Sequence, residues 1–266
     1  MINGTGPLFK SLGGEGPDCI LIHGFGSDSL SWAANIPALL PVARAHAVDL
    51  PAHGECKSVF TAKSLPENAD TFVNGMRKAG ISSAHFVGHS LGGAIALAVA
   101  ARHPDMVKSL ALIAPMGLGH GVDGQFLQSL VNVQSVDEGL RLLQQLFVHK
   151  QLVNKMLSKR LLDHLNKPGI RDALSKLAAV IKGWENEDIP ALLSDLPGNI
   201  PKLVIWGSND GINRASEERI RLIGATPTLV GDAGHLPHIE QASIVSSSIV
   251  ALLKSERSRY SSVKEG

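Results

Sequence analysis

The sequence has 266 residues, of which 44% are hydrophobic and 18% charged, so the chain is long enough to bury a large core and too apolar to be disordered. Its 25 Lys and Arg residues nearly balance its 24 Asp and Glu residues, which leaves a formal net charge of +1. No strong electrostatic field results, so we expect neither nucleic acid nor an anionic membrane as a partner.

Three features of the sequence predict a cytoplasmic location. Residues 1–10 contain no basic segment followed by a long apolar run, so no secretory signal is predicted. The most apolar stretch, residues 94–101, is too short to span a bilayer. Cys19 and Cys56 are the only cysteines, and a pair in so long a chain predicts reduced thiols rather than a disulfide framework.

Short apolar runs alternate with helical patterns along most of the chain. This alternation predicts an α/β fold with a mostly parallel central sheet flanked by helices. Gly, Pro, Asp or His follows each run, at the edge where open α/β sheets bind ligands. The predicted strands, in chain order, are 19–22, 45–49, 85–88, 110–114, 203–206 and 228–230.

Residues 118–195 have a different pattern, because strand-like runs disappear and leucines recur at helical spacing. Examples are Leu140, Leu143 and Phe147. We expect this segment to form a helical lid over the ligand-binding edge of the sheet. Residues 1–117 and 196–266 are then the two parts of the core domain. The sequence is compatible with either a monomer or a homodimer, and in a homodimer the lid helices would be a candidate interface.

The segment Gly-His-Ser-Leu-Gly at residues 88–92 lies between the third predicted strand and an Ala-rich helix. A G-x-S-x-G motif in this context indicates a nucleophile elbow, a strained turn that exposes the serine hydroxyl. Gly88 and Gly92 leave the space that such a turn needs. Ser90 is therefore the predicted nucleophile; the alternative is a glycine-rich turn with an incidental serine.

The segment His-Gly-Phe-Gly at residues 23–26 follows the first predicted strand. In folds with a nucleophile elbow, this loop and the residue after the nucleophile supply backbone N–H groups to the oxyanion. Phe25 and Leu91 are the predicted donors. A tight structural turn is the alternative explanation of His23 and Gly24.

A serine hydroxyl needs a histidine to accept its proton, and the histidine needs a carboxylate to orient it. Asp210 follows the fifth predicted strand and His235 follows the sixth, so both are expected at the same edge as Ser90. This order, Ser then Asp then His, is the order found with nucleophile elbows. Asp232 and Asp123 are the alternative acids.

Motifs for metals and nucleotides are missing from the sequence. It contains no H-E-x-x-H segment, no paired C-x-x-C and no G-x-G-x-x-G after a predicted strand. We therefore expect neither a metal nor a cofactor.

Apolar side chains of the predicted lid and its flanks are candidates for binding an apolar acyl or alcohol group. Helix packing is the equally simple explanation for them. The candidate substrate-binding residues are Gly24, Met116, Phe126, Phe147, Trp184 and His238.

Taken together and in order, these motifs resemble the α/β-hydrolase family over nearly the whole chain. The segment Asp-Leu-Pro-Ala-His-Gly at residues 49–54 adds to this resemblance. Residues 112–126 also resemble the hydrolase-like domain in the dihydrolipoyl acetyltransferase component of acetoin dehydrogenase systems. The D-H-x-x-x-D-G motif of lipoamide acyltransferases is missing, however, because Leu-Asn-Lys-Pro follows Asp163 and His164. The resemblance thus implies a hydrolase.

The predicted function is hydrolysis of a small ester, thioester or related carbonyl compound through an acyl-enzyme on Ser90. Cleavage of a carbon–carbon bond by the same triad is an alternative, although such family members usually have Asn where this chain has His89. Cofactor-free perhydrolysis also stays open. A different class of function is a non-catalytic small-molecule receptor, or an accessory component of an acetoin dehydrogenase-type system.

Overall fold

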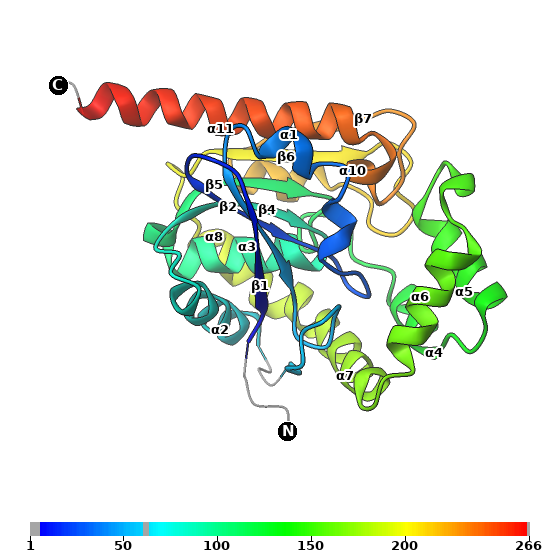
Figure 1. The fold of residues 1–266 in the computed structure, drawn as a ribbon. Coiled ribbons are helices and arrows are strands. Elements are labelled where there is room, and N and C mark those ends of the chain that lie inside the picture. Colours follow the sequence, from blue (N-terminus) through cyan, green and yellow to red (C-terminus); the bar gives the residue numbers. More distant parts are fainter. Residues whose placement is uncertain (1–5, 61–63, 265–266) are drawn as a thin grey trace.

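The computed structural model describes residues 6–60 and 64–264 and is built around one seven-stranded sheet (Figure 1). The strand order is β1-β3-β2-β4-β5-β6-β7. Every neighbouring pair from β3 to β7 is parallel, which confirms the predicted α/β class. The strands are β1 (Leu8–Gly13), β2 (Asp18–Ile22), β3 (Arg44–Asp49), β4 (Ala84–His89), β5 (Val107–Ile113), β6 (Lys202–Gly207) and β7 (Pro227–Val230).

Strand β1 was not expected from the sequence. It pairs antiparallel with β3, with Leu8 opposite Asp49. Its residues are exposed or half-buried, so it has no continuous apolar run that would mark a strand. An edge strand of an antiparallel pair needs only one buried face, and the pairing with β3 determines its position.

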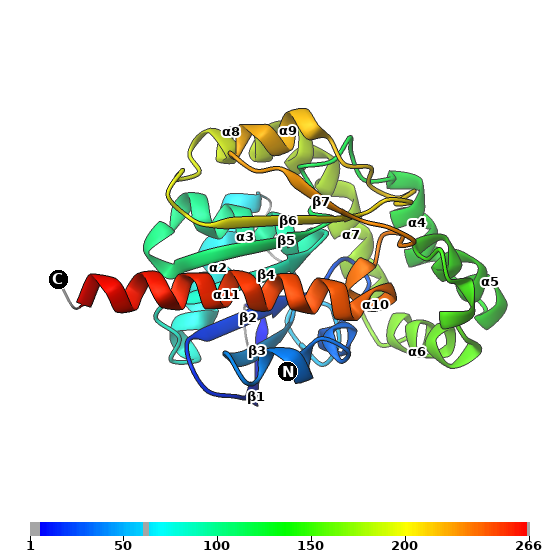
Figure 2. The same ribbon diagram turned by 90° about the horizontal axis from the view of Figure 1, so that it is seen from above.

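Helices cover both faces of the sheet, with α1 and α11 on one side and α2, α3 and α8 on the other (Figures 1 and 2). The helices of the core are α1 (Ile36–Leu39), α2 (Leu65–Lys78), α3 (Leu91–Arg102), α9 (Glu217–Leu222), α10 (Pro237–Glu240) and α11 (Ala242–Lys264), with the short helices η1 (Ser29–Trp32) and η2 (Pro104–Met106). None of the helices in the described residues is long and apolar enough to cross a membrane.

Successive residues of the central strands point into two separate apolar cores. In β2, Ile20 and Ile22 belong to the larger core with α2 and α3, whereas Leu21 belongs to the smaller core with Val245 and Ile249 of α11. Side chains of a strand alternate between the two faces, so a strand buried on both sides reads as a continuous apolar run. This burial explains why the central strands were predictable.

A helical insertion, residues 114–201, separates β5 from β6. Its helices α4, α5 and α6 lie beyond the carboxyl ends of the parallel strands, away from the tail end of α11 (Figures 1 and 2). Helix α8, in contrast, packs against α3 in the core. The insertion contains α4 (Gly124–Asn132), α5 (Val136–Leu143), η3 (Gln144–Leu146), η4 (Lys150–Leu152), α6 (Lys155–Leu165), α7 (Ile170–Gly183), the π-helical turn η5 (Trp184–Asp188) and α8 (Ile189–Ser194).

Candidate active site

Ser90 lies at the turn between β4 and α3, with φ 50° and ψ −114°. A positive φ is strained for a residue with a side chain, and persists only where the surroundings hold it. Here the Ser90 N–H donates to Ile113 O at 3.0 Å, and Ser90 O accepts from the N–H groups of Gly93 (2.9 Å) and Met116 (3.0 Å). The neighbouring strand β5 and the start of α3 thus hold the turn in place.

The glycines around Ser90 are required by close backbone contacts. A Cβ on Gly92 would overlap the carbonyl oxygen of Ile22 in the adjacent strand. A Cβ on Gly88 would lie 2.5 Å from Gly92 O. Real Cβ atoms do not approach oxygen so closely, so any side chain at either position would push the turn apart.

Asp210 and His235 come from the loops after β6 and β7, and the fold brings them together at the same edge as Ser90. The His235 Nδ1–H donates to Asp210 Oδ2 at 2.8 Å, and both side chains are buried. With the proton on Nδ1, His235 Nε2 is left as the acceptor that a general base requires.

The Asp210 carboxylate is held by further donors. Its Oδ2 also accepts from Trp206 Nε1 at 3.0 Å, and its Oδ1 accepts from the N–H groups of Ile212 (2.8 Å) and Asn213 (2.9 Å). Burial raises the pKa of Asp210, but His235 and these backbone donors outweigh it and hold the pKa below its usual range. Asp210 therefore stays ionised near neutral pH.

The two alternative acids lie in other environments. Asp123 caps the N-terminus of α4, where Oδ1 accepts from Gln125 N at 2.9 Å. Asp232 pairs with His149 Nε2 at 3.0 Å and its side chain is 64% exposed. Neither carboxylate contacts His235, so the geometry favours Asp210 as the orienting acid.

Two buried histidines hold the loop that carries Phe25. His23 Nε2 accepts from Leu50 N at 3.1 Å and His53 Nε2 accepts from Gly26 N at 2.9 Å, so each ring carries its proton on Nδ1. Those Nδ1–H groups donate to Gly24 O and Pro51 O, each at 2.7 Å.

Burial lowers the pKa of both His23 and His53, which favours these neutral forms. Both residues are part of the sequence motifs, but a motif does not show that their imidazole rings position the predicted oxyanion loop.

Asp49 connects the same loop to the rest of the core. Its carboxylate accepts from Ser29 N at 2.8 Å and Glu55 N at 2.9 Å, and pairs with Lys10 at 2.8 Å. Burial opposes ionisation, but Lys10 and the backbone donors lower the pKa of Asp49 to about 2. Gly54, with φ 55°, has no room for a side chain beside this carboxylate.

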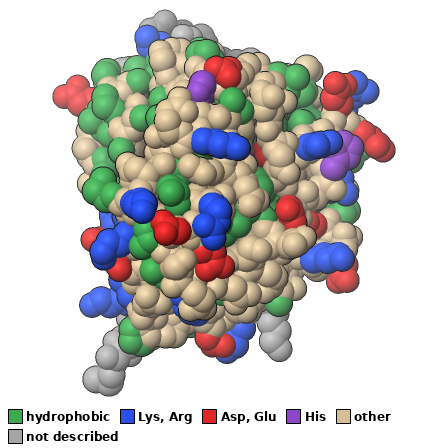
Figure 3. Space-filling model, turned by 90° about the vertical axis from the view of Figure 1, so that its right-hand side faces the viewer, with side chains coloured by type: hydrophobic (Ala, Val, Ile, Leu, Met, Phe, Trp, Pro, Cys, Tyr) green, Lys and Arg blue, Asp and Glu red, His purple; other side chains and the backbone are tan. Residues whose placement is uncertain are grey.

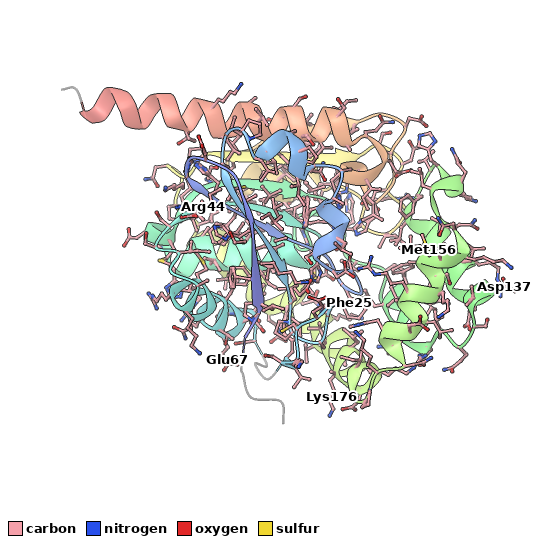
Figure 4. The ribbon with its side chains drawn as sticks, viewed as in Figure 1. Phe25, Arg44, Glu67, Asp137, Met156 and Lys176 are labelled. Atoms are coloured by element: carbon pink, nitrogen blue, oxygen red, sulfur yellow. The ribbon has the colours of Figure 1, made fainter. Side chains whose placement is uncertain are left out.

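A cavity of about 830 Å³ lies between the sheet edge and the insertion, and Ser90 and His235 are both in its wall. Phe25 lies on the sheet side and Met156 on the insertion side, as the labels in Figure 4 show. The larger apolar side chains of the wall are those of Phe25, Leu30, Val122, Phe126, Leu127, Leu143, Leu146, Phe147, Leu152, Met156, Leu157, Leu161, Ile212, Leu236 and Ile239.

Of the six candidate substrate-binding residues, the structure brings Gly24, Phe126 and Phe147 to the cavity wall. Met116, Trp184 and His238 are not in that wall. Met116 is turned into the large core beside the elbow, and Trp184 packs among the helices of the same core. His238 is fully buried against Trp32, at a ring-centroid distance of 4.5 Å. The sequence alone does not distinguish a residue that lines the cavity from one that is packed in the core beside it.

His89, inside the elbow motif, supports the catalytic-histidine loop. Its Nε2–H donates to His235 O at 2.9 Å, and its ring lies 4.8 Å from the ring of His235 and 4.7 Å from that of His238. Burial lowers the pKa of His89 well below its ordinary value, so the ring is neutral. A neutral donor at this position leaves the His235 side chain free to take a proton.

Among the described residues, no group of three or more His, Cys, Asp or Glu side chains gathers in a way that would hold a metal ion. The face that the insertion presents to solvent has basic and acidic side chains scattered among apolar and uncharged ones (Figure 3). The cavity wall contains Ser90 and His235 together with charged side chains such as those of Lys10, Arg160 and Asp163.

Comparison with known proteins agrees with this architecture. A family model described as alpha/beta hydrolase fold matches residues 20–242. The dihydrolipoyllysine-residue acetyltransferase component of the acetoin cleaving system of Pseudomonas putida is 36% identical over 246 residues, 91% of this chain. This match confirms the resemblance expected from residues 112–126. The chain spans 65% of the length of that protein and of its Cupriavidus necator counterpart.

Two further relatives are hydrolases by name. A pimeloyl-[acyl-carrier protein] methyl ester esterase of Vibrio atlanticus is 24% identical over 257 residues, 92% of this chain and 97% of that one. The solved structure of 2-hydroxy-6-oxo-6-phenylhexa-2,4-dienoate hydrolase from Rhodococcus sp. strain RHA1 superposes with a TM-score of 0.80 at 20% identity, and the match covers 94% of this chain and 96% of that one. The fold, the elbow and the matched family model together show that the chain belongs to the α/β hydrolase family.

Proposed function

We propose that the protein is a serine hydrolase that cleaves an ester or thioester with an apolar group through an acyl-enzyme on Ser90. The observation that carries the proposal is the 2.8 Å hydrogen bond between His235 Nδ1 and Asp210, in a cavity whose wall also contains Ser90 at a strained strand-to-helix turn. This combination supplies a nucleophile, a base with a free acceptor nitrogen and an ionised orienting acid.

In the first half-reaction, Ser90 Oγ attacks the carbonyl carbon and His235 Nε2 takes the hydroxyl proton. The backbone N–H groups of Phe25 and Leu91 stabilise the negative charge on the carbonyl oxygen. The tetrahedral intermediate then collapses, and the leaving alcohol or thiol takes the proton from His235. Asp210 stabilises the imidazolium throughout and stays ionised.

In the second half-reaction, a water molecule attacks the acyl-enzyme while His235 Nε2 takes its proton. Collapse of the second intermediate returns that proton to Ser90 Oγ and releases the carboxylic acid. The net reaction consumes one water molecule for each ester or thioester bond that is broken.

The wall of the cavity supports an apolar acyl or alcohol group as the bound part of the substrate. Phe126, Leu127, Leu146 and Phe147 of the insertion face the space above Ser90. A site of this size buries most of an apolar ligand, and the charged side chains in the same wall can orient a polar part of it. We further propose that residues 118–195 act as a lid that shapes this pocket.

The test is labelling with a fluorophosphonate probe, with Ser90→Ala as the matched control, followed by nitrophenyl esters of increasing acyl length. Wild-type protein should be labelled and turn over the esters, and Ser90→Ala should do neither, with turnover lower by at least about 10,000-fold. A folded wild-type protein that takes no label contradicts the proposal and favours a small-molecule receptor.

Cleavage of a carbon–carbon bond is distinguished by a second substrate. The compound that gives the Rhodococcus hydrolase its name, 2-hydroxy-6-oxo-6-phenylhexa-2,4-dienoate, is a suitable test substrate. We expect this protein to cleave it at least about 100-fold more slowly than the best ester. The reverse order of rates would replace the esterase proposal with the carbon–carbon hydrolase.

A role in acetoin metabolism is a second candidate, because of the relative in Pseudomonas putida that is 36% identical. On this proposal the hydrolase works beside an acetoin dehydrogenase complex as an accessory component. Stoichiometric co-elution of the two purified proteins on size-exclusion chromatography would support it, and separate elution at micromolar concentrations would contradict it.

A further inference from the structure

Glu240, the last residue of α10, joins two parts of the molecule that are far apart in sequence. Its Oε2 accepts from Gly234 N at 2.6 Å, in the loop that carries His235. Its Oε1 accepts from the N–H groups of Val148 (2.7 Å) and His149 (2.8 Å), in the insertion between η3 and η4. One carboxylate therefore bridges the catalytic-histidine loop and the insertion.

Backbone contacts reinforce this junction. The N–H of His235 itself donates to Leu146 O at 2.9 Å. A Cβ on Gly234 would lie 2.6 Å from the same oxygen, so the two segments approach as closely as a glycine allows. His149 Nε2 also lies 3.0 Å from Asp232 Oδ2, at the other end of the histidine loop.

The segment held in this way contributes to the cavity. Leu146 and Phe147 lie in the cavity wall, immediately before the residues that donate to Glu240. A substrate that packs against Leu146 and Phe147 thus contacts the same segment that fixes the backbone of His235. By comparison, the side chain of His235 is oriented from the core side, by Asp210.

We infer that Glu240 is a positioning residue, which ties the insertion to the catalytic-histidine loop so that His235 reaches its working position only when residues 146–149 are docked. The inference rests on the proposed serine-hydrolase function. It assigns to the insertion a part in proton transfer as well as in substrate selection. Because a misplacement of about 1 Å in a catalytic group costs up to roughly 100-fold in rate, a loosened tie is measurable.

Glu240→Gln breaks the tie with almost no change in shape. A glutamine side chain has one acceptor oxygen, and its amide group only donates. The glutamine oxygen can therefore accept either from Gly234 N or from the N–H groups of Val148 and His149. The amide NH2 group then faces the backbone N–H on the opposite side, where no hydrogen bond can form. Glu138→Gln is the matched control, because Glu138 is a half-buried insertion residue whose Oε2 accepts from Gln134 N at 2.9 Å, outside the cavity wall.

The expected result for Glu240→Gln is a kcat and a rate of Ser90 phosphonylation that fall roughly 10- to 100-fold, with KM changed less than about threefold. Glu138→Gln should match wild type in all three. A role for Glu240 in stability alone would lower the melting temperature and leave the phosphonylation rate of the folded protein unchanged, and that outcome would overturn the inference.

Amide hydrogen exchange tests the tie without any activity. In Glu240→Gln, exchange should accelerate together in residues 146–149 and in residues 232–235, and Glu138→Gln should change neither segment. Faster exchange in only one of the two segments contradicts a link between them. If wild-type Ser90 takes no label, the proposed function fails, and hydrogen exchange still decides whether the two segments are tied.

A second variant covers the case in which Glu240→Gln does not fold. Val148→Pro removes one N–H donor from the opposite side of the tie and leaves the carboxylate intact. Phe147, at φ −121° and ψ 143°, already has the extended conformation that the residue before a proline adopts. The same fall in phosphonylation rate, smaller in size, is expected; a wild-type rate in this variant would overturn the inference.

Discussion

The sheet edge and the helical insertion build opposite sides of one cavity by different means. On the sheet side, Ser90 and Asp210 are buried and held by backbone N–H and C=O groups from neighbouring strands and loops. On the insertion side, apolar side chains reach far into solvent, with Met156 77% exposed and Leu152 45% exposed. Close-packed backbone tolerates no change of shape, whereas exposed helices do. On the proposed function, the sheet edge supplies the reacting groups, whereas the insertion shapes the substrate pocket and, through Glu240, helps to position His235.

The connections between the two sides differ in strength as well. Glu240 and Leu146 join them through short hydrogen bonds to backbone near His235. Along α6, in contrast, Arg160 pairs with Asp28, and His164 donates to Ala52 O at 3.0 Å. Arg160 is about half exposed, so its ion pair is screened by solvent and salt. Residues 146–149 are therefore firmly attached to the core, whereas α6, which we call the weakly held end of the insertion, makes a solvent-screened ion pair.

The largest expected effect lies on the sheet side. Asp210→Asn keeps the shape of the acid, but an amide no longer holds the proton of His235 on Nδ1, so the base presents the wrong tautomer. We expect kcat to fall about 10,000-fold with little change in KM. Steady-state kinetics on the best nitrophenyl ester measures this. Asp232→Asn is the control; a comparable loss there would transfer the role of the acid to Asp232.

The buried histidines are expected to make the core sensitive to acid. Burial lowers the pKa of His23, His53 and His89, and lowers that of His238 to about 3, from an ordinary value of 6.5. Below pH 6.5 the unfolded chain binds more protons than the folded one, so stability is full above that pH and is lost as pH falls.

For His238, whose pKa is about 3 in the folded protein, the loss is about 1.4 kcal/mol for each pH unit between 6.5 and that value. Urea unfolding at several pH values measures the slope. His238→Phe should make this slope shallower, because it removes one buried neutral ring. A free energy of unfolding that is constant over this range would show that the rings are not buried in their neutral form.

A pair of glycine substitutions compares the packing of the two regions directly. Gly92→Ala places a Cβ against Ile22 O and should cost about 3 kcal/mol of stability, with loss of Ser90 labelling. Gly183→Ala in α7 meets nothing within 4 Å and should stabilise by about 0.5–1 kcal/mol. Thermal unfolding of both variants checks the contrast, and equal effects would remove the distinction between a rigid edge and a tolerant insertion.

The smallest expected effect is at the weakly held end of the insertion. Arg160→Gln removes the ion pair with Asp28 and should change KM by a few-fold at most, with kcat unchanged, since an exposed pair contributes about 0–1 kcal/mol. The difference from wild type should shrink as salt is added. A large fall in kcat would mean that this end of the insertion also positions the catalytic groups.

Sequence patterns predicted the central strands well and the edge strand not at all. Strands β2, β4 and β5 are buried on both faces, so their apolar runs are continuous, and His, Ser or Pro follows each of them within two residues. Strand β1 is half exposed and is specified by its pairing with β3, a contact between residues about 40 positions apart. Tertiary contacts also decide that Phe126 faces the cavity whereas Trp184 is packed in the core, and the local sequence pattern does not separate the two.

The sequence by itself determined the α/β class, the elbow around Ser90 and the candidates Asp210 and His235, because these features depend on short-range patterns: apolar runs, tight turns and the residue types that follow them. Only the tertiary structure decided which side chains share the cavity, which carboxylate meets His235, and that His53 and Glu240 hold the loops around it. Most of those contacts join segments separated by 25 residues or more, such as Asp210 and His235. A pattern in the chain does not carry that information, because it depends on how whole elements pack.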